Sequence, residues 1–228
     1  MIVSKPTLKQ ILDVLKRQVL VGKSYLDLAK GLLEADAAIR DTAPTFFGLT
    51  IDGSLELAQM TIARLYDDAT RGSVTIRRML VRAAEEVASF QRGDEHSVRA
   101  EIAKRKAAIV ALGPVLESIR QRRNEWLVHL DPRTVTNPAS LSAKAKLSIP
   151  DLECVFKETE DILLKFSSLY EGVIGELQFL GGDDYKMALN WIRSAKCRSI
   201  ENFEKEFGVG SWTGQRPKDC SRNMLDMI

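Results

Sequence analysis

Apolar residues recur every three or four positions along almost the whole chain, while the alternation of polar and apolar residues that marks strands is almost absent. The pattern therefore predicts an all-α protein, built as an antiparallel bundle of about five to seven helices. The first helix begins near Pro6, continues or restarts after Gly22, and ends near Arg40.

Two further helices and a longer helical stretch follow. One helix runs from Pro44 to the pair Asp67-Asp68, and the next begins with Ser73 as its N-cap and ends in the turn QRGD. The stretch from about Ser97 to Leu130 is interrupted at Gly113-Pro114, because proline removes a backbone donor and kinks or splits a helix.

The last third of the chain is predicted to hold a long connection and two more helices. Residues 131–149 contain prolines, serines and threonines without a helical period, which makes them the best candidate for a functional loop. A helix then begins at Pro150 and ends at Gly181-Gly182, and the last helix spans roughly Asp183 to Phe207. We expect residues 1–182 to form one bundle domain, and residues 183–228 to add a helix and a polar tail that frays or docks loosely.

The composition is that of an ordinary soluble globular protein. The 228 residues are 45% hydrophobic and 28% charged, which is enough to bury a core. The net charge of +2 creates no field over the whole molecule, so any contact with a nucleic acid must be local. No apolar run has the length of a membrane span, and the first ten residues do not have the pattern of a signal peptide, so we expect a cytoplasmic protein.

The cysteines and histidines form no metal-binding pattern. Cys154, Cys197 and Cys220 are odd in number, far apart and in no CxxC arrangement, which argues against a disulfide framework and a zinc site and indicates a reducing compartment. His96 lies in an acidic turn and is expected to be a surface histidine. Phosphate-loop, HExxH and GxSxG motifs are absent, and we expect no metal and no cofactor.

The segment from Arg120 to Asp131 concentrates three arginines and the second of the two histidines. Helical steps from the preceding apolar residues Leu116 and Ile119 reach Arg123, so this arginine lies on the stripe that faces the core. A guanidinium in that position needs a carboxylate, a phosphate or a water-filled cleft, because an unpaired buried charge is costly. We therefore single out Arg123 as a candidate site residue.

A second face of the same helix carries Arg122, Glu125 and His129 at positions i, i+3 and i+7. Glu125 lies one turn from His129 and favours its protonated form, which suits a group that exchanges a proton near neutral pH. On an ideal helix Arg123 and His129 lie about 9 Å apart along the axis and about 120° apart around it. If the two act together, we expect a cleft at the end of the helix, shared across a dimer.

The phrase RRNEWLVHLDPR resembles the signature of the HEPN superfamily of helical proteins, in which an arginine and a polar residue precede a histidine by a few positions. Its form is similar to the abortive-infection AbiU-like branch, where a stretch like RDKxxAHLD takes this place, and Val128 replaces the alanine that is common there. The segment LELAQMTIARLYDDATRGSVTIRRML also resembles that branch, with a helix ending in RLYD before a serine-capped helix. The resemblance covers residues 40–135.

This resemblance implies a metal-independent endoribonuclease, or an RNA-binding relative, that acts as a toxin or phage-defence effector. Arg123 would hold the scissile phosphate, His129 would move protons and Asn124 would orient the site. The supporting residues are Glu125, Asp131 and Asp67, and the arginines that would contact RNA phosphates are Arg120, Arg122 and Arg133. We expect an RNA substrate (tRNA or mRNA), a homodimer with the motif near its interface, and an antitoxin or regulatory protein as a further partner.

Other interpretations stay open at the level of sequence. In one interpretation, Arg123 and His129 have no role other than to neutralise the end of a helix, where cations are favourable. In the same way, Asp67-Asp68 can be a solvated helix end. The protein can also be a HEPN member that binds RNA or nucleotides without cleaving them. Finally, it can be a helical protein-interaction module, such as a toxin-antitoxin partner, with an apolar surface on its last two helices.

Overall fold

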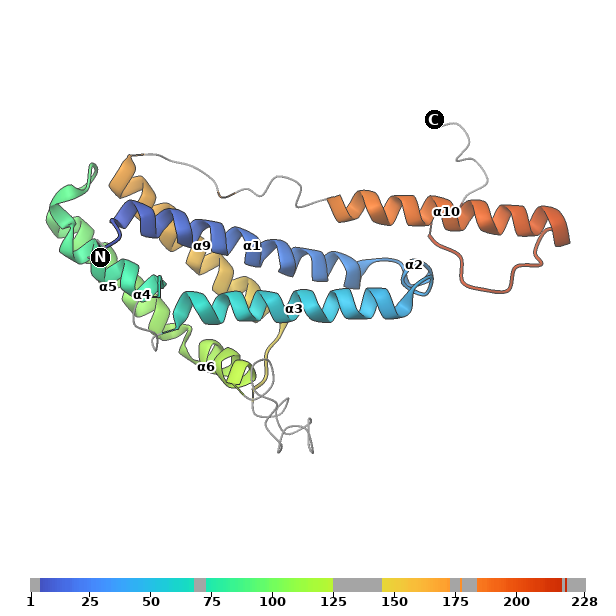
Figure 1. Cartoon of the computed structure of the whole chain (residues 1–228), viewed down its shortest axis with the longest axis horizontal. Coiled ribbons are helices and arrows are strands. Elements are labelled where there is room, and N and C mark those ends of the chain that lie inside the picture. The colour runs from blue at the N-terminus through green and yellow to red at the C-terminus, as the bar shows by residue number, and fades with distance from the viewer. Residues whose placement is uncertain are drawn as a thin grey trace, which may run out of the picture. The chain divides into compact units, whose positions relative to one another are not determined.

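The computed structural model describes residues 5–67, 73–124, 145–172, 177, 184–218 and 220. Within these ranges the regular structure is helical and contains no strand, so the predicted all-α class is confirmed. Figure 1 shows the helices along the chain. They are α1 (Leu8–Glu34), α2 (Ala37–Arg40), α3 (Pro44–Tyr66), α4 (Ile76–Glu85), the 3-10 helix η1 (Val87–Ser89), α5 (Glu95–Ala111), α6 (Gly113–Arg122), α9 (Ile149–Glu171) and α10 (Asp184–Phe207).

The chain divides into two compact units. The first contains residues 1–26 and 55–179, and the second contains residues 27–54 and 180–228, so that the boundaries fall within α1 and α3. The predicted domain division after residue 182 stays a prediction. None of the described helices is long and apolar enough to cross a membrane.

The first unit has one hydrophobic core, to which α1, α3, α4, α5, α6 and α9 contribute. The apolar stripe that predicts the first helix is the buried face of α1, where Leu8 and Leu12 are fully buried. Helix α1 passes through Gly22 without interruption. A Cβ atom at Gly22 would lie 2.7 Å from the ring of Phe156 and from Thr61. The bare backbone at this glycine therefore lets α1 pack closely against α3 and α9, which lie beside it in Figure 1.

The helical stretch that carries the arginine motif is divided where the sequence predicts it. Helix α5 begins after Asp94, whose carboxylate accepts a hydrogen bond from the Ser97 amide at 2.7 Å, and ends at Ala111. Helix α6 begins at Gly113 with Pro114 in its first turn, so the predicted interruption is confirmed. Residues 125–130 of that predicted stretch, and the predicted loop up to residue 144, lie outside the described residues.

Side-chain caps set the starts of α4 and α9. Thr75, rather than the predicted Ser73, is the N-cap of α4, because its hydroxyl accepts a hydrogen bond from the Arg78 amide at 3.3 Å. Ser148 and Asp151 form a reciprocal capping box at the start of α9, and these hydrogen bonds lower the pKa of the Asp151 carboxyl.

Helix α9 ends earlier than the sequence pattern predicts. Its last residue is Glu171 rather than a residue near Gly181, because Gly172 takes the left-handed conformation (φ 70°) and its amide bonds the Ser168 carbonyl. The apolar periodicity continues past this glycine, which is why the predicted end is wrong.

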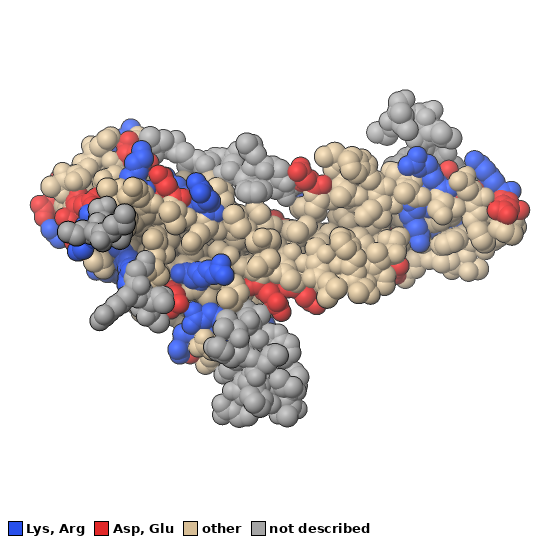
Figure 2. Space-filling model, viewed as in Figure 1, with Lys and Arg blue, Asp and Glu red and all other residues tan. Residues whose placement is uncertain are grey.

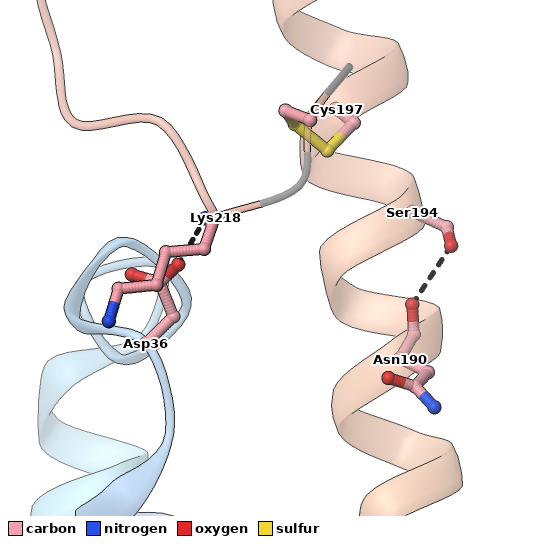
Figure 3. Close-up of a disulfide and its surroundings, with 6 residues drawn as sticks. Asp36, Asn190, Ser194, Cys197 and Lys218 are labelled. Atoms are coloured by element: carbon pink, nitrogen blue, oxygen red, sulfur yellow. Dashed lines mark hydrogen bonds between the residues drawn. A yellow bond between two sulfur atoms is a disulfide. The ribbon is translucent and has the colours of Figure 1, made fainter. Parts of the chain in front are cut away.

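In the second unit the chain after α10 folds back along that helix. A disulfide joins Cys197 in α10 to Cys220, with the two Cα atoms 5.6 Å apart (Figure 3). The prediction against a disulfide, made from spacing along the sequence, is therefore wrong, and the cysteine pattern no longer supports a reducing compartment. The 23-residue separation is bridged because the chain reverses at Gly208 and Gly210, both of which have positive φ.

The described part of the tail after α10 is held at several points, which corrects, for these residues, the prediction that it frays or docks loosely. The ring of Trp212 packs edge-on against Phe203 of α10, with the ring centroids 5.7 Å apart. Further along, the Lys218 amide donates a hydrogen bond to the carboxylate of Asp36 at the start of α2 (Figure 3). This bond is the main cause that lowers the pKa of Asp36. The described part of the tail is thus fastened to both α10 and α2.

Candidate functional site

A cavity of about 360 Å³ lies at the C-terminal end of α3, and its walls come from α3, α4 and α6 with the residues that follow α3 and α6. The uncharged part of its wall consists of Ile62, Ala63, Tyr66, Gly113, Leu116 and Ile119. The charged part consists of Asp67, Arg77, Glu117, Arg120 and Arg123. Figure 2 shows basic side chains gathered over α6, which contributes to this wall.

Arg123 lies at the C-terminal end of α6 and lines the cavity with a side chain that is 21% exposed. Its Nη1 donates to Asp67 Oδ2 at 3.0 Å, and its Nε donates to Asn124 Oδ1 at 3.0 Å. The sequence argument requires a carboxylate, a phosphate or a cleft beside this guanidinium. The structure supplies both a carboxylate and a cavity.

Asp67 follows the last residue of α3, where the negative end of the helix dipole disfavours a carboxylate. Its side chain is 24% exposed, and the guanidinium of Arg123 offsets the unfavourable position. Asp67 is therefore a partly buried ion-pair residue rather than a solvated helix end. Its neighbour Asp68 lies outside the described residues.

The two other arginines of the motif have different surroundings. Arg120 lines the cavity and donates to Glu117 through Nε at 2.8 Å and Nη2 at 2.7 Å, which lowers the pKa of the Glu117 carboxyl. Arg122 is not among the cavity-lining residues, and its Nε donates to the Ala145 carbonyl at 2.9 Å. The structure thus places Arg120 with Arg123, while Arg122 fastens the end of α6 to the chain that leads into α9.

Tyr66 is a cavity residue that sequence reasoning missed. Its hydroxyl lies 2.8 Å from the Thr159 hydroxyl, which itself donates to the Val155 carbonyl at 2.6 Å, so Tyr66 is the donor to Thr159. Burial raises the pKa of Tyr66 to about 12. The phenol is therefore neutral at physiological pH, and it anchors the end of α3 directly before Asp67.

Arg77 is a second cavity residue that sequence reasoning missed. It lies in the first turn of α4, in a different helix from the motif arginines, and it is exposed. Its charge acts on the Tyr66 phenol, where it is a minor cause that opposes the rise in pKa. In the sequence Arg77 is one of two adjacent arginines, and no spacing rule connects it to Arg123.

Part of the predicted site cannot be placed. Four of its residues lie outside the described ranges, namely Glu125, His129, Asp131 and Arg133. Of the three predicted catalytic residues, the structure brings Arg123 and Asn124 together, and Asn124 is exposed. The backbone at residues 123–124 forms a π-type turn, and the predicted angle between Arg123 and His129 stays a prediction because His129 lies outside the described residues.

The helical bundle and the arginine motif at its cavity are features expected of a HEPN protein. A family model, that of the HEPN family AbiU2, matches residues 8–189. The match covers far more than half of the 228 residues, and the chain therefore belongs to the AbiU2 family of HEPN proteins, which is related to abortive infection. It extends the resemblance seen over residues 40–135 to α1, α9 and the start of α10. No curated protein and no solved structure matches the chain.

Proposed function

We propose that the protein is a metal-independent endoribonuclease of the HEPN type that acts as a toxin or phage-defence effector. The observation that carries this proposal is the position of Arg123, whose guanidinium lines a cavity while Asp67 and Asn124 hold it in place. Family membership supports it, and so does the resemblance of the stretch from Arg123 to His129 to the HEPN motif.

Arg123 supplies the positive charge that a reacting phosphate requires. Its hydrogen bonds to Asp67 and Asn124 fix the plane of a group that has five N–H donors in all. A guanidinium held in this way stabilises an anionic transition state better than water does, because it does not have to reorient during the reaction. Arg120 lines the same cavity and adds a contact that positions the RNA strand.

The proposed reaction needs no metal ion. His129 takes the proton from a ribose 2′-hydroxyl, and the oxygen of that hydroxyl attacks the neighbouring phosphorus. The bond from phosphorus to the 5′-oxygen breaks, and this oxygen takes up a proton from the protonated imidazole, which returns to its neutral form. The products are a cyclic phosphate and a 5′-hydroxyl end. DNA lacks the attacking hydroxyl, so the substrate is RNA, and we propose tRNA or mRNA.

We further propose that the active form is a homodimer in the cytoplasm, with the motif near its interface. Two motifs that face one RNA would supply two guanidinium groups and two imidazoles. The arginine of one protomer and the histidine of the other could then act on the same phosphate, so one helix end would not have to direct both side chains at it. An antitoxin or regulatory protein would control such an effector, since uncontrolled RNA cleavage is toxic to the cell that makes it.

The test is cleavage of end-labelled tRNA and of a structured messenger fragment by the purified protein in EDTA. Arg123→Ala and His129→Ala are compared with Arg99→Ala, whose exposed side chain pairs with Glu95 on α5 and does not line the cavity. We expect cyclic phosphate ends with the wild type and Arg99→Ala, and none with the other two variants. Equal cleavage by all four proteins, or no cleavage by the wild type, overturns the assignment.

A second candidate function, binding of RNA or nucleotides without cleavage, is favoured by the ion pair itself. Asp67 already forms an ion pair with Arg123. A phosphate must therefore share the guanidinium with this carboxylate or displace the carboxylate from it. Such a competition suits reversible binding. In that case Arg123→Ala lowers RNA affinity, and neither the wild type nor any variant produces cleavage ends.

A further inference from the structure

We propose that Arg77 is an RNA-binding residue that holds a backbone phosphate adjacent to the one at Arg123. The kind of ligand rests on the proposed function, whereas the residue is assigned from the structure. Arg77 belongs to α4 and lies outside the motif, yet it lines the same cavity as Arg120 and Arg123. The cavity therefore receives guanidinium groups from two separate segments of the chain.

The charges of the wall favour a polyanion. Among the described cavity-lining residues there are three arginines and two carboxylates, those of Asp67 and Glu117. Glu117 bonds Arg120 twice, and Asp67 pairs with Arg123. The described part of the wall thus carries a net positive charge in a molecule whose net charge is only +2.

Arg77 is a basic residue in the first turn of α4. It lies two residues after Thr75, the N-cap of α4, and the first turn of α4 contains no acidic residue. The first turns of α5, α9 and α10 each carry an aspartate or glutamate, which is the favourable charge at that end of a helix dipole, whereas those of α1, α2, α3 and α6, like that of α4, carry none. A basic first turn at the edge of a cavity is unfavourable for the helix and favourable for an anion in the cavity.

The size of the cavity favours a single strand. A volume of about 360 Å³ lies near the lower end of the range for small-molecule sites, which suits one nucleotide and not a duplex. Ile62 and Leu116 offer apolar contact to a base or ribose, while the arginines of α4 and α6 suit the phosphates that flank it. Single-stranded RNA can splay out a base in this way. Arg77 would then contact the phosphate on the α4 side.

The experiment measures binding in the absence of cleavage. The probe is a fluorescent single-stranded oligonucleotide pool of mixed sequence with 2′-fluoro sugars, which lack the attacking hydroxyl. Anisotropy titrations of the full chain at several salt concentrations give Kd and its salt dependence. Arg77→Gln is compared with the matched control Arg78→Gln, which alters the adjacent exposed arginine of α4. Arg78 bonds the Ser73 carbonyl and does not line the cavity.

We expect Arg77→Gln to raise Kd roughly tenfold, the effect of losing one charge-assisted contact. The slope of log Kd against log salt should become shallower by about 0.7, the value for one phosphate of a single strand. Arg78→Gln should change neither quantity, and both variants should keep the wild-type helicity and Tm. Equal effects of the two variants overturn the proposal, and so does a wild-type chain that fails to bind the probe at low salt.

Cleavage by the same proteins separates this proposal from the endoribonuclease. If Arg77→Gln weakens binding in a protein that never cuts RNA, the phosphate contact stands and the endoribonuclease fails. If Arg77→Gln and Arg78→Gln bind alike while His129→Ala abolishes cleavage, the endoribonuclease stands and the role of Arg77 fails.

Discussion

The carboxylate of Asp67 accepts a hydrogen bond from the guanidinium of Arg123 at 3.0 Å, across 56 residues of sequence. The pair joins the C-terminal ends of α3 and α6 at one cavity. The guanidinium offsets a carboxylate that the dipole of α3 disfavours. A phosphate that enters the cavity therefore competes with this carboxylate for the same donor.

Asp67→Asn should lower the stability of the protein and at the same time strengthen its binding of anions. Asparagine keeps the shape of the side chain but removes its charge, so we expect the free energy of unfolding to fall by about 1 kcal/mol, as for a partly exposed pair. The Kd for the 2′-fluoro probe should fall several-fold, because the guanidinium loses its competitor. Urea unfolding and anisotropy measure the two effects. A Kd that rises as much as in Arg123→Ala would show that the positioning of Arg123 by Asp67 outweighs the competition between Asp67 and the ligand.

Tyr66 should make the protein less stable at high pH. Its folded-state pKa is raised to about 12, whereas an exposed tyrosine titrates near pH 10. The unfolded chain therefore loses this proton first, so the stability from the neutral phenol is complete below pH 10 and is lost as the pH rises toward 12. We expect a loss of up to roughly 2 kcal/mol over this range.

Tyr66→Phe provides the comparison for this pH effect. Urea unfolding of the wild type and the variant at pH 9 and at pH 11.5 gives the change in stability for each protein. The wild type should lose more free energy of unfolding than Tyr66→Phe between the two pH values. Identical losses would assign the alkaline instability to other groups.

The disulfide between Cys197 and Cys220 should stabilise the second unit. Loop-closure entropy for a 23-residue separation corresponds to about 3 kcal/mol, so reduction or Cys220→Ser should lower the thermal stability of this unit and expose residues 208–218 to protease. Cys154→Ser is the control, because Cys154 is an exposed free cysteine. Protease resistance that is the same with and without dithiothreitol would show that the noncovalent contacts of Trp212 and Lys218 hold the tail without the disulfide.

Two glycines inside long helices should respond in opposite ways to alanine. At Gly22 a Cβ atom would lie 2.7 Å from Phe156 and Thr61, so Gly22→Ala should destabilise the protein by roughly 1–3 kcal/mol. At Gly53, inside α3, nothing lies within 4 Å, and Gly53→Ala should stabilise it by about 0.5–1 kcal/mol through helix propensity. Chemical denaturation of both variants checks the signs, and a gain of stability in Gly22→Ala would contradict the close packing of α1.

The helical fold could be predicted from the sequence because its signals are local. The stripe that contains Leu8 and Leu12 is the buried face of α1, and the break at Gly113-Pro114 lies where proline chemistry requires it. Gly172 shows the limit of this reasoning. A glycine within an apolar pattern ends a helix only if it takes the left-handed conformation, as Gly172 does and Gly22 does not, and the pattern itself does not encode that choice.

The candidate site was less visible, because its cavity unites residues that are distant in the chain. Arg123 could be singled out, since a guanidinium on an apolar stripe is unusual. Its contact with Asp67 depends on how α3 and α6 pack, and Arg77 enters the site only through the position of α4. The link from Cys197 to Cys220 was missed for the same reason, because the reversal of the chain that permits it is not a feature of cysteine spacing.

The hydrogen bond from Arg122 to the Ala145 carbonyl holds together the two ends of the span that contains His129. Ala145 is fully buried, so the chain returns to a fixed point of the first unit. Each doubling of the length of a loop raises the entropic free energy of closing it by only about 0.6 kcal/mol. Insertions, deletions and substitutions between Arg122 and Ala145 are therefore compatible with an unchanged position of Arg123. A protein built in this way can vary the segment that carries its histidine without any change in the bundle that holds Arg123.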